Sequence, residues 1–238
     1  MSRIRPSGQS PKVWQLIERV DESGKLTKFT IQEIPEDRYE DAIQHMCTYF
    51  LVDEPICHYL KAKDDPLFVQ DISTMWRSSL AQGISIAAFL DNPNNGKIVA
   101  VNILSVNNNN RNKNLSDYKF KSDKCKKTLE IISNAKKKVM HEHYGVDQYL
   151  YTSGLSVDPD YRGYKLGRSM IKLRDLIGST YRIPATISVC TSIISQKITA
   201  DLGFEECLTK NFSDLMDEDE KQYFLGINCV IKIMGKRF

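Results

Sequence analysis

The sequence lacks the patterns that mark membrane, secreted and nucleic-acid-binding proteins. Its 238 residues contain no run of about eighteen apolar side chains, the length that a membrane-spanning helix needs. The first residues, MSRIRPSGQSPK, lack the apolar segment of a secretory signal. The net charge is only +3, too small to favour nucleic acid as a partner. We therefore expect a cytoplasmic protein that binds neither a membrane nor nucleic acid.

Cysteine is present, but not in a metal-binding pattern. None of the six cysteines belongs to a CxxC pair, and none stands at zinc-ligand spacing from a histidine. Several lie in apolar runs, where a free thiol acts as a small hydrophobic side chain. We expect free thiols in a reducing compartment, and no metal.

One segment is locally basic. From Arg111 to Lys138, ten basic residues face only three acidic ones. A solvated helix face and loop explain such a run. The alternative is a basic rim that attracts a polyanion such as a nucleotide.

Hydrophobic periodicity predicts strands and helices along most of the chain. The predicted strands are residues 14–20, 26–34, 84–90, 98–106, 149–157, 185–190, 204–210 and 223–233. The predicted helices are residues 37–53, a segment from 55, 66–81, a lysine-rich helix ending before 143, 164–178 and 192–202. The first two strands form a hairpin, and the polar residues 107–110 form a loop.

No repeat or linker divides these elements, so we expect a single domain of the α/β (α+β) class. Its three layers are a mixed, mostly antiparallel central sheet with helices on both faces. Residues 13–238 form this domain, and residues 1–12 form a flexible N-terminal lead-in. We expect it to act as a monomer.

The strand that ends at Val157 runs through a turn, shaped by Pro159 and Gly163, directly into a helix. Unpaired N–H groups at a helix start carry about half a positive charge, so such a turn suits a diphosphate. Lys165 and Arg168 add side-chain charge there. The turn lacks GxGxxG and GK[ST], which argues against a Rossmann site and a P-loop. The alternative is an ordinary strand–turn–helix connection.

The string VDPDYRGYKLG, from Val157 to Gly167, resembles motif A of the GNAT acetyltransferase superfamily, V-x-P-x-x-R-G-x-G-x-G/A. The later Leu202-Gly203-Phe204 resembles the superfamily's LGF, and the resemblance runs from about residue 28 to 232. Three local strings are similar to the insect arylalkylamine N-acetyltransferase-like group. These are Asp53-Glu54-Pro55, Leu155-Ser156-Val157-Asp158 with Tyr161-Arg162-Gly163, and Cys190-Thr191-Ser192 with Ser195.

The resemblance implies acetyl-CoA as co-substrate, with its pyrophosphate on the turn and its pantetheine arm on a strand that splays from its neighbour. The residues that it implies for this binding are Leu155, Ser156, Val157, Arg162, Gly163, Tyr164, Lys165, Leu166, Gly167 and Arg168. Lys165 departs from the pattern, because it stands at the middle glycine. Its Cβ limits the approach of a phosphate, although its ammonium can reach one.

The same resemblance assigns Glu54 to removing the proton of the attacking ammonium through water, since an alkylammonium has a pKa near ~10. Pro55 suits the first helical position, which makes Glu54 the cap residue, and glutamate is a poor cap. The alternative is a surface carboxylate favoured by the helix dipole. Flanking side chains either wall an amine pocket or belong to the core: Tyr49, Phe50, Ile56 and Tyr59.

Ser195 is implied as the hydroxyl that protonates or polarises the leaving thiolate, with Thr191 assisting in a proton relay. The subgroup tends to have serine at the position of Thr191. The alternative is that Thr191 and Ser192 are N-caps and that Ser195 lies on the polar face of the following helix.

The expected activity is transfer of acetyl from acetyl-CoA to a small primary amine, an arylalkylamine by resemblance, through direct attack and without an acyl-enzyme. One alternative is a protein or peptide N-acetyltransferase on the same fold. The other is an acyl-CoA-binding module without catalysis, which Lys165 and Thr191 suggest.

Overall fold

The computed structural model describes residues 3–20, 24, 26–91, 96–108, 118–139, 143–217 and 219–238. Within them, eight strands form one sheet in the order β1-β2-β3-β4-β5-β6-β8-β7. The strands are β1 (Val13–Val20), β2 (Leu26–Glu33), β3 (Ile86–Leu90), β4 (Ile98–Asn108), β5 (Gln148–Val157), β6 (Ala185–Cys190), β7 (Glu205–Asn211) and β8 (Val230–Arg237). β5 and β6 pair in parallel and the other neighbours antiparallel, which confirms the predicted mixed sheet.

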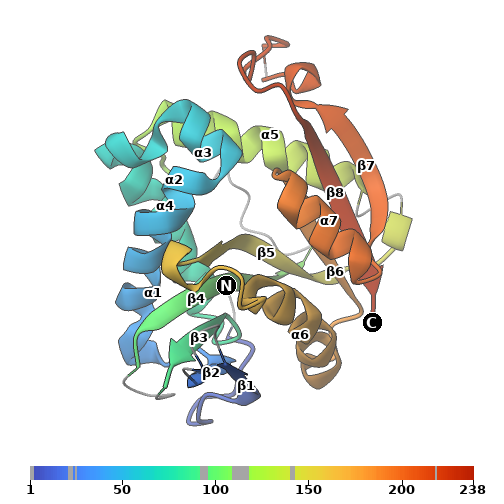
Figure 1. Ribbon diagram of the computed structural model, residues 1–238. Helices are drawn as coiled ribbons and strands as arrows, with labels where there is room; N and C mark the ends of the chain where they lie inside the picture. Colours follow the sequence, from blue (N-terminus) through green and yellow to red (C-terminus); the bar gives the residue numbers. More distant parts are fainter. Residues whose placement is uncertain are drawn as a thin grey trace.

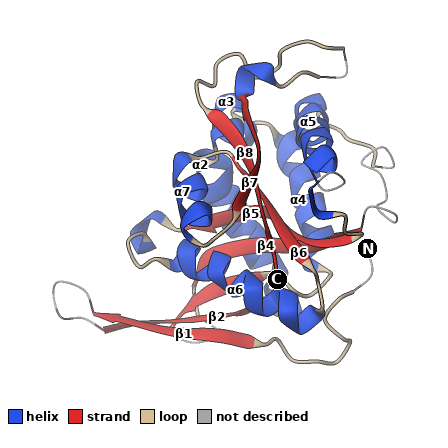
Figure 2. Cartoon of the chain, turned by 90° about the vertical axis from the view of Figure 1, so that its right-hand side faces the viewer, coloured by secondary structure: helices blue, strands red, loops and turns tan. Residues whose placement is uncertain are grey.

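Helices cover both faces of this sheet (Figures 1 and 2). On one face lie α1 (Tyr39–His45), α4 (Pro66–Leu80) and α5 (Asp123–Val139), and on the other lie α6 (Leu166–Tyr181) and α7 (Ile193–Asp201). A π-helical turn (Met46–Phe50), α2 (Leu51–Asp53) and α3 (Pro55–Leu60) connect α1 to α4. The three-layer arrangement is therefore as predicted.

Each face of the sheet has its own apolar core. Met46 and Trp76, both fully buried, belong to the cluster under α1 and α4. Met170 and Ile177, which recur at helical spacing, belong to the cluster under α6. The two cores explain why most predicted strands and helices are confirmed, because each element buries one regular face.

Two predicted segments are wrong. The last strand begins at Val230 and not at residue 223, since Phe224 is instead buried in a loop, where its ring packs 5.8 Å from that of Phe212. The predicted loop at 107–110 is wrong for Asn107 and Asn108, which lie in β4 and pair with Tyr149 and Gln148 of β5. Residues 109–110, like Arg111 and the basic residues up to 117, lie outside the described residues.

Part of the N-terminal lead-in packs against the domain, at Ile4 and Arg5, whereas residues 6–10 are exposed. The packed part differs from the flexible segment that we expected. The N–H groups of Ile4 and Arg5 both donate to the carbonyl of Gln82. The Arg5 side chain is 2% exposed and forms an ion pair of 3.2 Å with Glu33, which is fully buried. Sequence patterns missed this contact because a buried ion pair has no periodicity.

β5 and β6 separate soon after they meet. Their register contains only Leu150↔Thr186 and Tyr151↔Ile187, whereas β5 continues to Val157 in pairing with β4. The edge of β5 that faces β6 is therefore left without a strand partner over its second half. This is the splayed strand that the resemblance implies.

All six cysteines are free thiols, as expected. Among the residues that the structure describes, no helix combines the length and the apolar character needed to cross a bilayer.

Candidate active site

A cavity of about 1520 Å³ opens where β5 and β6 part. Its walls come from α3, α4 and α5 on one side and from α6 and α7 on the other. It is lined by all three predicted catalytic residues, Glu54, Thr191 and Ser195. The predicted cofactor residues also line it, with one exception: Tyr164 packs its ring 5.2 Å from that of Phe29.

The turn after β5 places a helix start at the cavity. Gly163 has a φ of +88°, a value that favours glycine, and α6 begins at Leu166. Within the described residues no side chain caps this helix, so its first N–H groups remain available. Gly167 and Arg168 of this first turn line the cavity. The geometry is that of an anion site.

Lys165 adopts a left-handed conformation at this turn, with a φ of +61°. The GNAT pattern has glycine at this position, and the backbone retains the conformation that glycine prefers. The side chain is exposed, and Lys165 lines the cavity. The departure from the motif therefore places strain, together with a positive charge, at the helix start.

Lys165→Gly is expected to be more stable than Lys165→Ala by about 1 kcal/mol, because only glycine relieves the left-handed backbone. Both variants lose the ammonium, so urea unfolding of the pair isolates the backbone effect. Gly167→Ala is the matched control: Gly167 lacks a positive φ, and an added Cβ would meet its nearest atoms at 3.7 Å. Equal stability of the two Lys165 variants would contradict the assignment of strain.

Two arginines at the cavity are held by carboxylates. Arg162 pairs with Asp53 of α2, which joins the turn to the segment that carries Glu54. Arg168 pairs with Asp201 of α7 at 3.1 Å. Both pairs are half-exposed, so each guanidinium is positioned at the rim and remains accessible to an anion.

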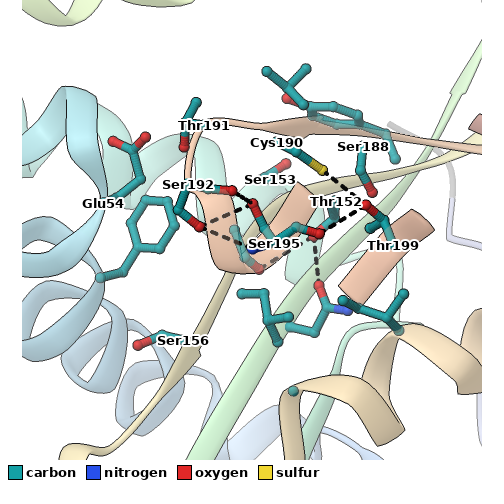
Figure 3. A pocket seen from close by; sticks show the side chains of 18 of the residues that line it. Glu54, Thr152, Ser153, Ser156, Ser188, Cys190, Thr191, Ser192, Ser195 and Thr199 are labelled. Carbon is teal, nitrogen blue, oxygen red and sulfur yellow. Dashed lines mark hydrogen bonds between the residues drawn. The ribbon is translucent and has the colours of Figure 1, made fainter. Parts of the chain in front are cut away.

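The two carboxylate oxygens of Glu54 differ in their hydrogen-bond partners. Oε2 accepts a hydrogen bond of 2.7 Å from the N–H of Cys57 and caps α3, where Pro55 is the first residue. Oε1 is buried and has no hydrogen-bond partner among the described residues. The argument that capping explains Glu54 poorly is thus wrong, because the side chain folds back onto the helix start. The Glu54 side chain lines the cavity (Figure 3).

The segment before Glu54 depends on a close approach to β5. A Cβ on Gly154 would lie 2.6 Å from Cε of Met46 and 3.1 Å from Cε2 of Phe50. A larger residue would require the Met46 methyl and the Phe50 ring, which lines the cavity, to shift. Ile56 also lines the cavity, whereas Tyr49 and Tyr59 do not belong to its lining.

Serine and threonine side chains form a hydrogen-bonded cluster at the start of α7 (Figure 3). Ser192 is the N-cap, and its Oγ accepts from the N–H of Ser195 at 3.1 Å. The Oγ of Ser195 donates to the carbonyl of Ser192 at 2.8 Å and lies 3.0 Å from the Ser192 Oγ. Thr191 precedes the cap and lines the cavity without capping the helix.

Sequence reasoning missed several lining residues. Ser153 of β5 is bulged out of the register with β4, and its carbonyl lies 3.5 Å from Nε1 of Trp76. Trp76 itself stacks edge-on against Phe50 at 5.9 Å, which gives an aromatic wall. Arg174 of α6 is fully buried and also lines the cavity. A basic residue four positions after Met170, on the apolar face of a helix, is the one signal that could have found it.

Cys57 lies beside Glu54 but does not have the properties of a nucleophile. Burial, together with the charge of Glu54, holds the pKa of its thiol well above the ordinary value. A thiol with a raised pKa stays protonated at neutral pH. Among the described residues of the cavity, a carboxylate and hydroxyls are therefore better candidates for chemistry than this thiol.

Comparison with known proteins gives structural relatives only. No family model matches the chain, and no curated protein matches it. Among solved structures, an Aedes aegypti protein with the provisional name arylalkylamine N-acetyltransferase 7 is 28% identical, with a TM-score of 0.88 over 100% of this chain and 99% of that one. The mosquito arylalkylamine N-acetyltransferase-like 5b is 21% identical (TM-score 0.78; 88% and 100% covered).

A third similar structure is the polyamine N-acetyltransferase of Drosophila melanogaster, which forms N-acetylagmatine. It is 16% identical, with a TM-score of 0.73 over 88% of this chain and 100% of that one. These similarities confirm the predicted resemblance: the chain has the GNAT fold and is similar, over its full length, to the structure of an insect arylalkylamine N-acetyltransferase-like protein.

Proposed function

We propose that this protein is an N-acetyltransferase that moves the acetyl group of acetyl-CoA to a small primary amine, of the arylalkylamine kind, by direct attack. One observation carries the proposal: a single cavity joins the uncapped start of α6 to the unpartnered Oε1 of Glu54. The names of the structural relatives support acetyl transfer in general.

The residues that line the cavity fit acetyl-CoA. The start of α6 with Lys165, Arg162 and Arg168 would hold the pyrophosphate, since unpaired N–H groups and basic side chains converge there. The unpaired edge of β5, which includes residues 155–157, would bind the amide groups of the pantetheine arm. The acyl thioester then lies in the gap between β5 and β6.

Glu54 is the general base in this proposal. The ammonium must lose a proton before its nitrogen can attack, and Oε1 is the group available to take that proton directly or through a water. The aromatic wall formed by Phe50 and Trp76 would bind the body of the amine. Among the described acids of the lining, Asp53 and Asp201 pair with arginines, which leaves Glu54 for the substrate.

Ser195 is the group proposed to protonate the departing sulfur. Its hydroxyl lines the cavity and lies within hydrogen-bond distance of Ser192 Oγ, so a proton taken from Ser195 can be replaced by its neighbour. Thr191, on the same rim, would assist such a relay. These hydroxyls complete a site to which one chain supplies every residue, which supports action as a monomer. The free cysteines support a reducing compartment such as the cytoplasm.

The test is a screen for amine-dependent release of CoA. Purified protein with acetyl-CoA is expected to release thiol with phenethylamine or tryptamine and to form the N-acetyl product, identified by mass. A reaction without amine corrects for the six free thiols of the protein. Turnover of peptides alone would favour a peptide N-acetyltransferase. CoA binding without turnover of any acceptor would favour the non-catalytic acyl-CoA-binding module.

A further inference from the structure

Arg174 is a buried cation that forms no ion pair with a carboxylate among the residues that the structure describes. Its side chain is fully buried under α6, beside Leu173 and Ile177. The guanidinium donates to neutral acceptors only, which lie on β5 and β6: the carbonyls of Ile187 (2.8 Å) and Leu150 (3.4 Å), and the hydroxyls of Ser188 and Thr186. Its Nε has no partner among the described residues.

Such a residue is costly, because desolvating a charge without an opposite charge opposes folding. Burial lowers the pKa of Arg174 to about 10, and the guanidinium still carries its proton at neutral pH. An apolar side chain of similar length would fill the same space without this cost. The charge therefore calls for an explanation beyond packing.

Arg174 lies at the end of the cavity where β5 and β6 part, which is where the proposed function places the thioester. It binds the strands where their pairing ends, at Leu150 and Ile187, and it lines the cavity. Its partner Ser188 lies two residues before Cys190 on β6, so both side chains point to the same face. Figure 3 shows Ser188, Cys190 and Thr199 around the same pocket.

A chain of contacts leads from this face to the proposed proton donor. The thiol of Cys190 lies 3.7 Å from Oγ1 of Thr199. Thr199 in turn donates to the carbonyl of Ser195 at 2.8 Å. The charge of Arg174 favours the ionised form of the Cys190 thiol, although burial raises its pKa overall. Both the Ser195 hydroxyl and the charge of Arg174 act on the Cys190 thiol, so this thiol lies between the two side chains.

We propose that Arg174 supplies the positive charge that stabilises the CoA thiolate as it leaves. The inference rests on the proposed function. In that step the amine nitrogen forms a bond to the carbonyl carbon, the carbon–sulfur bond breaks, and its electron pair stays on sulfur. The thiolate then takes a proton from Ser195 or from solvent. The first proton of the ammonium has passed to Glu54, and the acylated nitrogen gives up its second proton to restore Ser195 or to solvent.

One further described cation lines this part of the cavity: Nζ of Lys136 lies 3.7 Å from the centre of the Tyr151 ring. Asp175, the residue after Arg174, is paired with Lys236 at 2.8 Å. Burial raises the pKa of the Tyr151 phenol and of the Cys190 thiol, so both stay neutral at neutral pH. The ring of Phe204 lies 5.4 Å from the guanidinium and carries no net charge. Arg174 is the fully buried cation at this end of the cavity, so its charge is the one that water screens least.

The test measures the thiol pKa of bound CoA from the ultraviolet absorbance of the thiolate, with the desulfo-CoA complex as the blank for protein thiols. In the parent protein we expect this pKa to lie below that of free CoA. Arg174→Gln is expected to raise it by about one unit, equivalent to about tenfold less thiolate, and to lower kcat about tenfold. Arg174→Lys, which keeps the charge, should retain most of both effects.

The affinity for desulfo-CoA separates this role from a structural one. Desulfo-CoA contains no thiol sulfur to stabilise, so its affinity should change less than twofold in Arg174→Gln. An unchanged thiol pKa in that variant would overturn the inference while leaving acetyl transfer intact. If the variant does not fold, a thiol pKa in the parent protein no lower than in free CoA overturns it equally. Failure of the parent protein to bind CoA would overturn the proposed function as well.

Discussion

Glu54→Gln is expected to lower kcat/KM for amine acetylation by about a hundredfold to a thousandfold, the range over which general bases contribute. Glutamine keeps an oxygen that can accept from the N–H of Cys57, so α3 remains capped. It cannot take a proton from an ammonium. Initial rates over a series of amine concentrations, at saturating acetyl-CoA, give the value, and CoA affinity should be unchanged.

Two further variants separate catalysis from capping. Glu54→Ala should lose the same activity and, in addition, about 1 kcal/mol of stability, because the cap is removed. Asp65→Ala is the matched control, since Asp65 caps α4 through the N–H groups of Leu67 and Phe68 and is not part of the cavity lining. It should lose stability and keep its activity. Full activity of Glu54→Gln would rule out the base and leave Glu54 a structural cap.

Arg5→Met is expected to reduce the free energy of unfolding by about 3–5 kcal/mol, the usual cost of breaking a buried ion pair from one side. Within the described part of the chain, the variant leaves the fully buried Glu33 with two neutral donors, the Tyr181 hydroxyl (2.6 Å) and the N–H of Lys12 (3.0 Å). Urea unfolding measures the loss. A flexible lead-in, by contrast, predicts no change.

Controls for Arg5 come from the same region. Arg3→Met removes the exposed pair with Glu36 and should cost far less, because water screens such pairs. The double variant Arg5→Met with Glu33→Gln should recover part of the loss, since no unpaired charge remains buried. If the double variant is no more stable than Arg5→Met alone, the loss comes from packing of the arginine side chain and not from its charge.

The cofactor turn shows how much of the site could be predicted from the sequence. The strand that ends at Val157, the turn at Gly163 and the helix that follows are local features, encoded by proline, glycine and hydrophobic spacing within a dozen or so residues. Lys165 was also visible as a departure from the motif. Its left-handed backbone was not, because a dihedral angle depends on how the turn packs.

Glu54 shows where prediction from the sequence ended. Its place before Pro55 indicated a helix start correctly. One of its oxygens caps α3, and the other has no partner among the described residues. This difference depends on the side-chain rotamer and on the packing of elements that are distant in sequence. Arg174 and Arg5 were missed for a related reason, since their partners on β5, β6 and β2 are remote in sequence.

Regular hydrophobic spacing and turn residues act locally, so they were enough to predict the mixed three-layer domain, nearly every strand and helix, and the resemblance of one turn to a CoA-binding motif. What this turn faces follows from the tertiary structure. The cavity opens where the β5–β6 pairing ends early, and Gly154 leaves room for the π-helical turn before Glu54 to lie close to β5. The first feature depends on the divergence of two strands, and the second depends on a contact between segments about a hundred residues apart. No local sequence pattern encodes either one.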